Sequence, residues 1–284
     1  MGGALDELVD LLDLEKIEEN IFRGRQPDED RQRVFGGQVA GQALVAATRT
    51  VESDRRVHSL HAYFLRPGDP SIPILYDVDR IRDGKSFTTR RVVAIQHGRA
   101  IFNLAASFQH DEDGLDFSAS MPDAPDPVTL PTFKERYAAH ADRMGPWYHR
   151  PRPIDMRYVD APLPGEEPPA GSQTSQRVWM RADGALPGDP TLHACIVTYA
   201  SDMTLLDTTL LPHSLRWNEG AIQMASLDHA MWFHRPFRAD EWLLYAQETP
   251  STSGARGLAL GSIFRPDGQI AISVVQEGLI RMVR

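Results

Sequence analysis

The sequence has almost no cysteine, and two further absences narrow its function. Cys195 is the single cysteine in 284 residues, so we expect neither a disulfide framework nor a cysteine-based zinc site. No apolar run reaches membrane-spanning length. Basic residues do not predominate either, because 30 Lys and Arg oppose 39 Asp and Glu, a net charge of −9. This charge argues against a general nucleic-acid binder. We therefore predict a cytoplasmic chain with no cofactor, no metal, no nucleic-acid partner and no membrane span.

The N-terminal stretch has none of the marks of a targeting segment. It reads MGGALDELVDLLDLEKIEE, which is acidic and has neither a basic opening nor a continuous apolar run, so we expect no signal peptide. Leu5, Leu8, Val9 and Leu12 instead have the spacing of one helical face. Because 42% of the residues are hydrophobic, the chain can bury a sizeable core.

The chain contains nearly the same phrase twice, SLHAYFLRP at 59–67 and SLDHAMWFHRP at 226–236. The aromatic and Arg-Pro parts of the two phrases are 169 residues apart, and Gly98 and Gly268 further on are 170 apart. A weaker match upstream has a separation of 157. Self-similarity on this scale indicates tandem duplication. The rise in separation predicts about 12 extra residues in the second copy, placed in MTLLDTTLLPHSLRWNEG.

Each copy has the same expected order of elements. In the first copy a strand at 20–25 and a helix at 36–51 precede β-rich runs at about 57–65, 72–81, 86–97 and 99–109. In the second copy the helix covers 191–202. One helix wrapped by an antiparallel sheet is the hotdog architecture. The sequence therefore predicts an α+β fold of two tandem hotdog units, a double hotdog.

The first helix is rich in small residues, which favours a buried helix with a sheet wrapped closely around it. These residues are Gly36, Gly37, Ala40, Gly41, Ala43, Ala46 and Ala47.

Three domain segments are expected. Residues 1–110 form an N-terminal hotdog unit without catalytic residues, and 171–284 form a C-terminal unit that carries them. Residues 111–170 form a linker that is acidic and rich in proline. Within the linker, TFKERYAAHADRM indicates a helix, while RPRPIDM and APLPGEEPPAGSQ indicate loops.

Three polar residues of the second copy fall inside otherwise apolar elements, and aliphatic residues replace all three in the first copy. The polar residues are Asp202, Ser226 and Gln276, and their counterparts are Val45, Val57 and Ala106. Buried polar groups are costly unless they are paired, so the copy that keeps them is the candidate site. A carboxylate can deprotonate water, and a hydroxyl and an amide can hold that water and donate to developing negative charge. Because the set has no strong nucleophile beside a base, direct water attack is favoured over an acyl-enzyme.

Each residue also has an ordinary interpretation when it is taken alone. Asp202 suits a helix end, and Ser226 and Gln276 suit a strand. Asp228, His229 and His234 lack the spacing of a metal site, so we assign them a structural role. Cys195 suits buried packing. Neither G-x-S-x-G nor H-E-x-x-H occurs, which counts against α/β-hydrolase and zincin mechanisms.

Longer motifs carry a resemblance to a known family. VFGGQVAGQAL, VHSLHAYFLRPGDPSIPILYDVDRIRDGKSF, YASD, DHAMWFHRPF, EWLLY and VVQEGLIR closely resemble the type II acyl-CoA thioesterases (the TesB-like family), from about Phe22 to Arg281. The resemblance implies a double hotdog with an Asp, Thr or Ser, and Gln triad in its second half. Motif by motif, these positions fall on Asp202, Ser226 and Gln276.

The resemblance further implies that the chain hydrolyses fatty acyl-CoA to free fatty acid and CoA, with a tunnel for the acyl chain near a helix. It also implies a homo-oligomer, a dimer or tetramer. Two alternatives remain open: a hotdog enoyl-CoA hydratase or dehydratase, and an acyl-CoA-binding protein without turnover. Release of free thiol from an acyl-CoA distinguishes the three.

Overall fold

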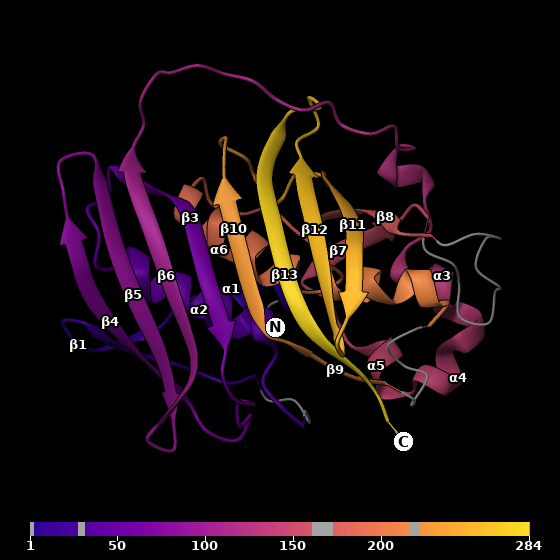
Figure 1. Ribbon diagram of the computed structural model, residues 1–284, viewed down its shortest axis with the longest axis horizontal. Helices are drawn as coiled ribbons and strands as arrows, with labels where there is room; N and C mark the ends of the chain where they lie inside the picture. The colour runs from indigo at the N-terminus through magenta and orange to yellow at the C-terminus, as the bar shows by residue number, and fades with distance from the viewer. Residues whose placement is uncertain (1–2, 28–31, 161–172, 216–221, 284) are drawn as a thin grey trace.

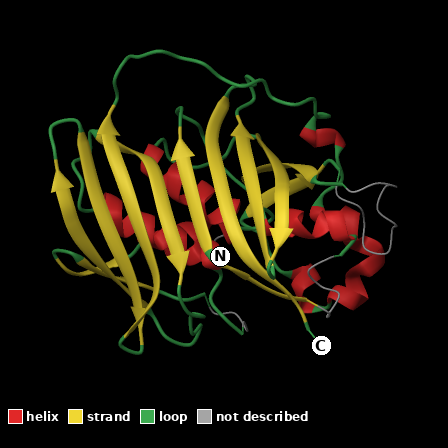
Figure 2. Ribbon diagram, in the orientation of Figure 1, coloured by secondary structure: helices red, strands yellow, loops and turns green. Residues whose placement is uncertain are grey.

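A computed structural model describes residues 3–27, 32–160, 173–215 and 222–283. Within these ranges thirteen strands form one continuous antiparallel sheet, which faces the viewer in Figure 1 with the main helices behind it. The order across the sheet is β1-β2-β4-β5-β6-β3-β10-β13-β12-β11-β8-β7, and β9 pairs with β13 beside β10. The sheet is therefore two similar halves that meet at β3 and β10, as the strands of Figure 2 show.

The first hotdog unit is a central helix with five strands of the sheet around it. The helix is almost wholly buried, as the small residues predicted. It is α2 (Gly36–Thr48), and the strands are β2 (Ile21–Gly24), β3 (Arg55–Phe64), β4 (Ile74–Asp83), β5 (Phe87–Gln96) and β6 (Arg99–His110). Before them, α1 (Ala4–Leu12) has the predicted helical face, and β1 (Glu15–Glu18) adds an edge strand that the sequence did not indicate.

The second hotdog unit repeats this plan with one strand split in two. Its helix begins at a proline, and the side chain of Asp189 caps it by accepting from the Thr191 N–H at 2.9 Å. The helix is α6 (Pro190–Ser201), and the strands are β8 (Ser175–Ala182), β9 (Ile222–Ser226), β10 (Asp228–Phe233), β11 (Leu243–Ser253), β12 (Arg256–Phe264) and β13 (Ile270–Met282).

Strand register confirms the alignment of the two copies. In the first unit Val57 lies opposite Phe108, and in the second unit Ser226 lies opposite Gly278. These pairs are separated along the chain by the same 169 and 170 residues that align the two copies. The double hotdog predicted from the sequence is therefore the observed fold.

The repeated Arg-Pro has a structural explanation. Arg66 Nη1 donates to the carbonyl of Ala100 at 2.6 Å, and Arg235 Nη1 donates to the carbonyl of Ile270 at 2.9 Å. In each unit this bond ties the chain after one strand to the first residues of its neighbour. The Arg-Pro sequence is repeated because each copy uses the same arginine–carbonyl hydrogen bond after the equivalent strand.

Two glycines of α2 have an effect that the sequence did not predict. A Cβ on Gly37 would lie 2.3 Å from the carbonyl oxygen of Tyr199, and a Cβ on Gly41 would lie 3.3 Å from that of Cys195. Both carbonyls belong to α6. At these two positions the missing side chain lets the two central helices approach each other, rather than letting the sheet approach α2.

The second copy is longer between its helix and its next strand, as predicted. The intervening residues are 49–54 in the first copy and 202–221 in the second. The insertion contains a 3₁₀ helix, η3 (Leu206–His213), while its residues 216–221 lie outside the described part. Leu206 packs on Gly278, because a Cβ on Gly278 would lie 2.3 Å from Leu206 Cδ1. The extra residues thus cover the inner side of β13.

The linker is more structured than predicted. After β6 it crosses the top of the sheet to the opposite end of the molecule (Figure 1). The expected helix at TFKERYAAHADRM is broken into short pieces, and the expected loop RPRPIDM runs into a strand that pairs with β8. These elements are η1 (Pro127–Thr129), α3 (Phe133–Tyr137), η2 (Ala138–His140), α4 (Ala141–Met144), α5 (Pro146–His149) and β7 (Ile154–Tyr158). The predicted loop APLPGEEPPAGSQ and the 170/171 boundary fall almost wholly outside the described residues.

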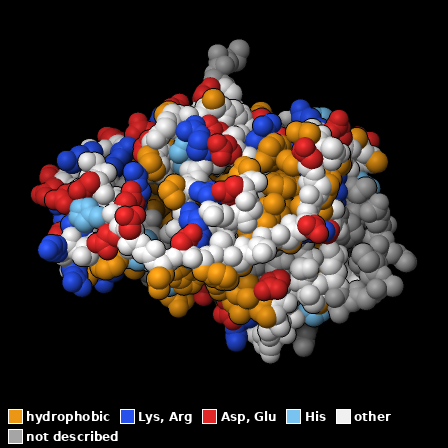
Figure 3. All heavy atoms as spheres, turned by 90° about the horizontal axis from the view of Figure 1, so that it is seen from above, with side chains coloured by type: hydrophobic (Ala, Val, Ile, Leu, Met, Phe, Trp, Pro, Cys, Tyr) orange, Lys and Arg blue, Asp and Glu red, His pale blue; other side chains and the backbone are white. Residues whose placement is uncertain are grey.

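Charge is mixed on the surface shown in Figure 3. Acidic and basic side chains are interspersed there, rather than gathered into a basic face. Among the described helices, none combines the length and the hydropathy that a membrane span requires.

Candidate active site

Asp202, Ser226 and Gln276 meet at one point in the second unit. Gln276 Nε2 donates to Asp202 Oδ1 at 2.6 Å and to Ser226 Oγ at 3.0 Å. Ser226 Oγ also donates to Asp202 Oδ1, over a longer 3.4 Å. The structure therefore brings together all three residues that the copy comparison selected.

Three different elements supply this triad. Asp202 is the C-cap of α6, with φ −84° and ψ −1°, so its side chain leaves the helix where the helix ends. Ser226 is the last residue of β9, just before the chain leaves the ladder and returns as β10. Gln276 is fully buried in the middle of β13. The triad thus depends on the helix end and the sheet holding their relative positions.

The environment of Asp202 suits a general base. Burial raises the pKa of its carboxyl from 3.8 to about 6, even though hydrogen bonds from Gln276, the Gly37 N–H and Ser226 act to lower it. A base is most effective when its pKa lies near the working pH. At neutral pH this carboxylate is ionised and still basic enough to take a proton from water.

The first copy contributes to this site, which the sequence did not predict. Gly36 and Gly37 open α2, whose N-cap residue Phe35 makes no side-chain capping bond. The Gly37 N–H bonds to Asp202, and a Cβ on Gly36 would lie 2.7 Å from Asp202 Oδ2. A helix N-terminus carries partial positive charge. The candidate site therefore includes backbone of the first copy, and the pair of glycines at the helix start was the sequence signal for it.

A second carboxyl group, that of Asp207, lies close enough to Asp202 for the charge of Asp202 to affect its pKa. Burial raises the pKa of Asp207 to about 7, and the charge of Asp202 adds to this rise. Asp207 belongs to η3, in the insertion that the first copy lacks. Sequence reasoning missed it because an inserted residue has no counterpart for comparison.

The corresponding place in the first unit is filled differently. Ala106 lies opposite Arg90, whose side chain is buried. The Arg90 guanidinium donates to Thr50 Oγ1 at 2.9 Å and to Asp83 Oδ1 at 2.6 Å. An arginine bound to its own neighbours thus stands beside the counterpart of Gln276.

The remaining candidates of the sequence have hydrogen-bonding or packing positions. His229 Nε2 lies 2.8 Å from Ser201 Oγ, and His234 Nε2 lies 2.9 Å from Ser273 Oγ. Cys195 is free and fully buried. In the part of the chain that the structure describes, no cluster of His, Cys, Asp and Glu is arranged to hold a metal ion.

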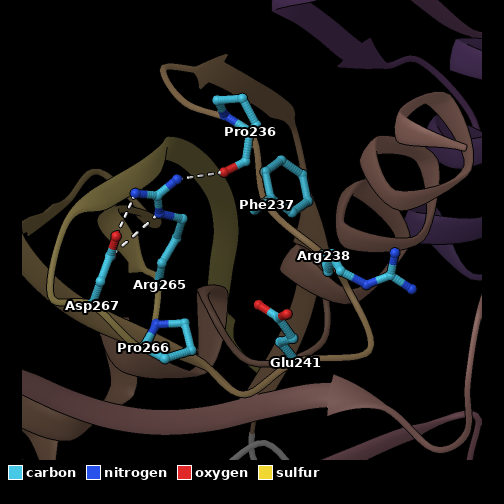
Figure 4. Close-up of a pocket in the computed structure, with 7 residues that line it drawn as sticks. All are labelled: Pro236, Phe237, Arg238, Glu241, Arg265, Pro266 and Asp267. Atoms are coloured by element: carbon cyan, nitrogen blue, oxygen red, sulfur yellow. Dashed lines mark hydrogen bonds and ion pairs between the residues drawn. The ribbon is translucent and has the colours of Figure 1, made fainter. Parts of the chain in front are cut away.

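A surface groove of about 390 Å³ lies elsewhere on the second unit. Figure 4 shows Arg265 directed at Asp267 and the carbonyl of Pro236, while Arg238 points away from the other labelled residues. Arg238 pairs with Asp240. Both guanidinium groups of the groove already have carboxylate partners, so the triad is the better candidate for the active site.

Comparisons with known proteins identify the family. A family model described as acyl-CoA thioesterase matches residues 152–279, and one described as acyl-CoA thioesterase N-terminal domain matches 26–109. Acyl-coenzyme A thioesterase 8 of Mus musculus is 43% identical over 96% of this chain and 88% of its own length. Acyl-CoA thioesterase 2 of Haemophilus influenzae is 40% identical over 99% of both chains. The crystal structure of an acyl-CoA thioesterase II from Mycobacterium marinum has a TM-score of 0.80 and 45% identity, covering 98% of each chain.

Proposed function

The chain belongs to the acyl-CoA thioesterase family, and we propose that Asp202, Ser226 and Gln276 carry its reaction. It hydrolyses acyl-CoA thioesters, and the substrates proposed here are fatty acyl-CoAs, cleaved to free fatty acid and CoA by direct attack of water. The observation that carries the proposal is the convergence of the three residues on a carboxyl group whose pKa is raised to about 6.

Asp202 is the general base of the proposed reaction. It removes a proton from a water molecule while the water oxygen bonds to the thioester carbonyl carbon. When the tetrahedral intermediate collapses, the carbon–sulfur bond breaks, and the proton held by Asp202 passes to the departing CoA sulfur. Ser226 and Gln276 orient the water. Gln276 Oε1 is buried and has no protein partner among the described residues, so it is available to accept from that water.

The N-terminus of α2 is placed to stabilise the negative charge that develops on the carbonyl oxygen. Backbone N–H groups at a helix start have no partner inside the helix, and preorganised donors of this kind act where charge develops in the transition state. A Cβ on Gly36 would lie 2.7 Å from Asp202 Oδ2, so this end of α2 lies directly against the base. The Gly37 N–H is already bonded to Asp202, so the other N–H groups at the start of α2 would supply the oxyanion donors from the first copy, and the second copy would supply the base.

An acyl-enzyme route is less well supported. Burial raises the pKa of the Cys195 thiol and keeps it from substrate. Ser201 and His229 form a serine–histidine pair, but both side chains are fully buried. The relatives named above are thioesterases over nearly the whole chain, which disfavours the hydratase and the non-catalytic binding protein.

Asp202→Asn tests the assignment of the base. The asparagine keeps the size of the side chain and removes its basicity, so kcat should fall by about 10²–10⁴ while KM changes little. Release of free CoA thiol from dodecanoyl-CoA measures the change. A folded Asp202→Asn protein with wild-type turnover would overturn the mechanism.

Three finer expectations stay predictions. We assign residues 171–284 to the unit that carries the triad, because Asp202, Ser226 and Gln276 all lie there. Exposed apolar side chains on the sheet, such as Tyr63 and Phe87, favour a homo-oligomer. A single, free and buried cysteine suits the cytoplasm.

A further inference from the structure

The comparison of the two copies identifies one more polar pair in the second unit. Ser201 and His229 are fully buried, and the corresponding residues of the first unit, Leu44 and Leu60, are fully buried leucines. Leucine therefore satisfies the packing demand at both places. Burying a serine and a histidine in its stead is costly unless their hydrogen bonds serve a purpose.

Ser201 and His229 form a directed chain of hydrogen bonds. Ser201 Oγ donates its single proton to the carbonyl of Thr198 at 3.0 Å, so in the 2.8 Å contact with His229 it is the Nε2–H that donates to Ser201 Oγ. Burial lowers the pKa of His229 to about 4, which keeps the imidazole neutral. No charged residue is needed to hold it.

The chain ends beside the proposed base. Ser201 is the residue directly before Asp202, and its backbone carbonyl accepts from the Tyr245 O–H at 3.2 Å. The side chain of Ser201 is thus bound from β10 and its backbone from β11. The last residue of α6 is fixed to the sheet on two sides, and the carboxylate of Asp202 follows directly from it.

His229 also lies beside the amide of the triad. The next residue, Ala230, lies opposite Val275 on β13, which places His229 next to Gln276 across the two strands. Both side chains are buried on the inner side of the sheet. His229 therefore contacts the helix that leads to Asp202 and lies beside the strand residue Gln276.

We propose that His229 and Ser201 are positioning residues, which fix the end of α6 so that Asp202 Oδ1 stays within hydrogen-bonding distance of Gln276 and Ser226. This proposal rests on Asp202 being the general base. Neither residue touches substrate. Their effect is on the geometry of the base, where a misplacement of about 1 Å can cost roughly 10²-fold in rate.

Substitution by the first copy's residue is the sharpest test. His229→Leu keeps a buried side chain that this fold accommodates at the equivalent place, and Ser201→Ala removes only the hydroxyl. For each, kcat with dodecanoyl-CoA, per folded molecule, should fall roughly 10- to 100-fold with KM nearly unchanged. The double variant should be no slower than His229→Leu, because the two side chains act as one unit. His229→Gln, which restores an N–H near the position of Nε2, should recover most of the rate.

His193→Leu is the matched control. His193 is also buried, and its ring accepts a hydrogen bond from the Ala239 N–H at 3.0 Å. It lies near the start of α6, whereas Ser201 and Asp202 lie at the end of that helix. His193→Leu removes a comparable buried hydrogen bond and should keep wild-type kcat. Wild-type kcat in His229→Leu and Ser201→Ala, with Asp202→Asn inactive, would overturn the positioning role and leave the proposed function intact. Equal losses of kcat in His229→Leu and His193→Leu, without rescue by His229→Gln, would show that His229 contributes only packing. An active Asp202→Asn would overturn the proposed function itself.

Discussion

The raised pKa of Asp202 implies that the proposed catalytic carboxylate destabilises the fold. A carboxyl group with a pKa of 3.8 when unfolded and about 6 when folded holds its proton more tightly in the folded state. Its stabilising effect is therefore complete below pH 3.8 and is lost as the pH rises through 6. Above that, ionised Asp202 costs roughly 3 kcal/mol, because one pKa unit corresponds to about 1.36 kcal/mol.

Asp202→Asn removes this cost at every pH. The asparagine Oδ1 can still accept from Gln276, but its amide replaces the oxygen near the Gly37 N–H, and a lost hydrogen bond costs about 1 kcal/mol. The net gain in the free energy of unfolding should be about 2 kcal/mol at pH 8. At pH 4.5 the ionisation cost falls to about 1 kcal/mol, so the gain should vanish there.

Urea unfolding of wild type and Asp202→Asn at the two pH values measures the difference. Asp113→Asn, a change of the same kind at an exposed linker position, should stay within about 0.5 kcal/mol of wild type at both. If Asp202→Asn were less stable than wild type at pH 8, the ionised carboxylate would be a stabilising helix-end residue, and the account of its raised pKa would be wrong. The expected result is a variant that gains stability and loses turnover.

Four other variants, at three positions, test the surroundings of the base. In the wild type, kcat/KM should rise about tenfold per pH unit up to about pH 6 and then level off. Asp207→Asn should show the same rise. If the rise disappeared in this variant, Asp207 would be the base. Ser226→Thr should keep most of the turnover because the hydroxyl persists, whereas Ser226→Ala should lose roughly tenfold or more; equal rates in both would remove the hydroxyl from the mechanism. Gly36→Ala places a methyl group 2.7 Å from Asp202 Oδ2, so kcat should fall. An unchanged kcat would show that the start of α2 can move away from the Asp202 carboxylate without loss of activity.

The sequence predicted the fold well because duplication supplied two independent readings of each element. Val57 and Ser226 could be aligned from the repeated phrase alone, and strand register later confirmed the pairing. Strand alternation and the small residues of α2 were strong local signals. Weak signals failed where elements are short or depend on partners. Ile154–Tyr158 follows a proline-rich stretch and is a strand because β8 offers an edge to pair with.

The candidate site was predictable only in part, for a related physical reason. Comparison of copies finds residues that differ between equivalent positions, which is how Asp202, Ser226 and Gln276 emerged. It cannot find a backbone N–H such as that of Gly37, because every residue except proline has one. Nor can it find Asp207, whose segment exists in one copy alone. Both require knowledge of which elements meet in space.

The geometry of the two helices explains why one duplicated unit kept the triad while the other stayed necessary. α2 and α6 are so close that a Cβ on Gly37 would lie 2.3 Å from the carbonyl oxygen of Tyr199. This contact places the start of α2 against the end of α6, where Asp202 lies. A carboxylate alone at that point would face the sheet without the positive end of a helix. Under the proposed mechanism a single hotdog unit therefore lacks part of its site. The first copy needs no base of its own under this mechanism, but its helix is required because it places partial positive charge beside Asp202.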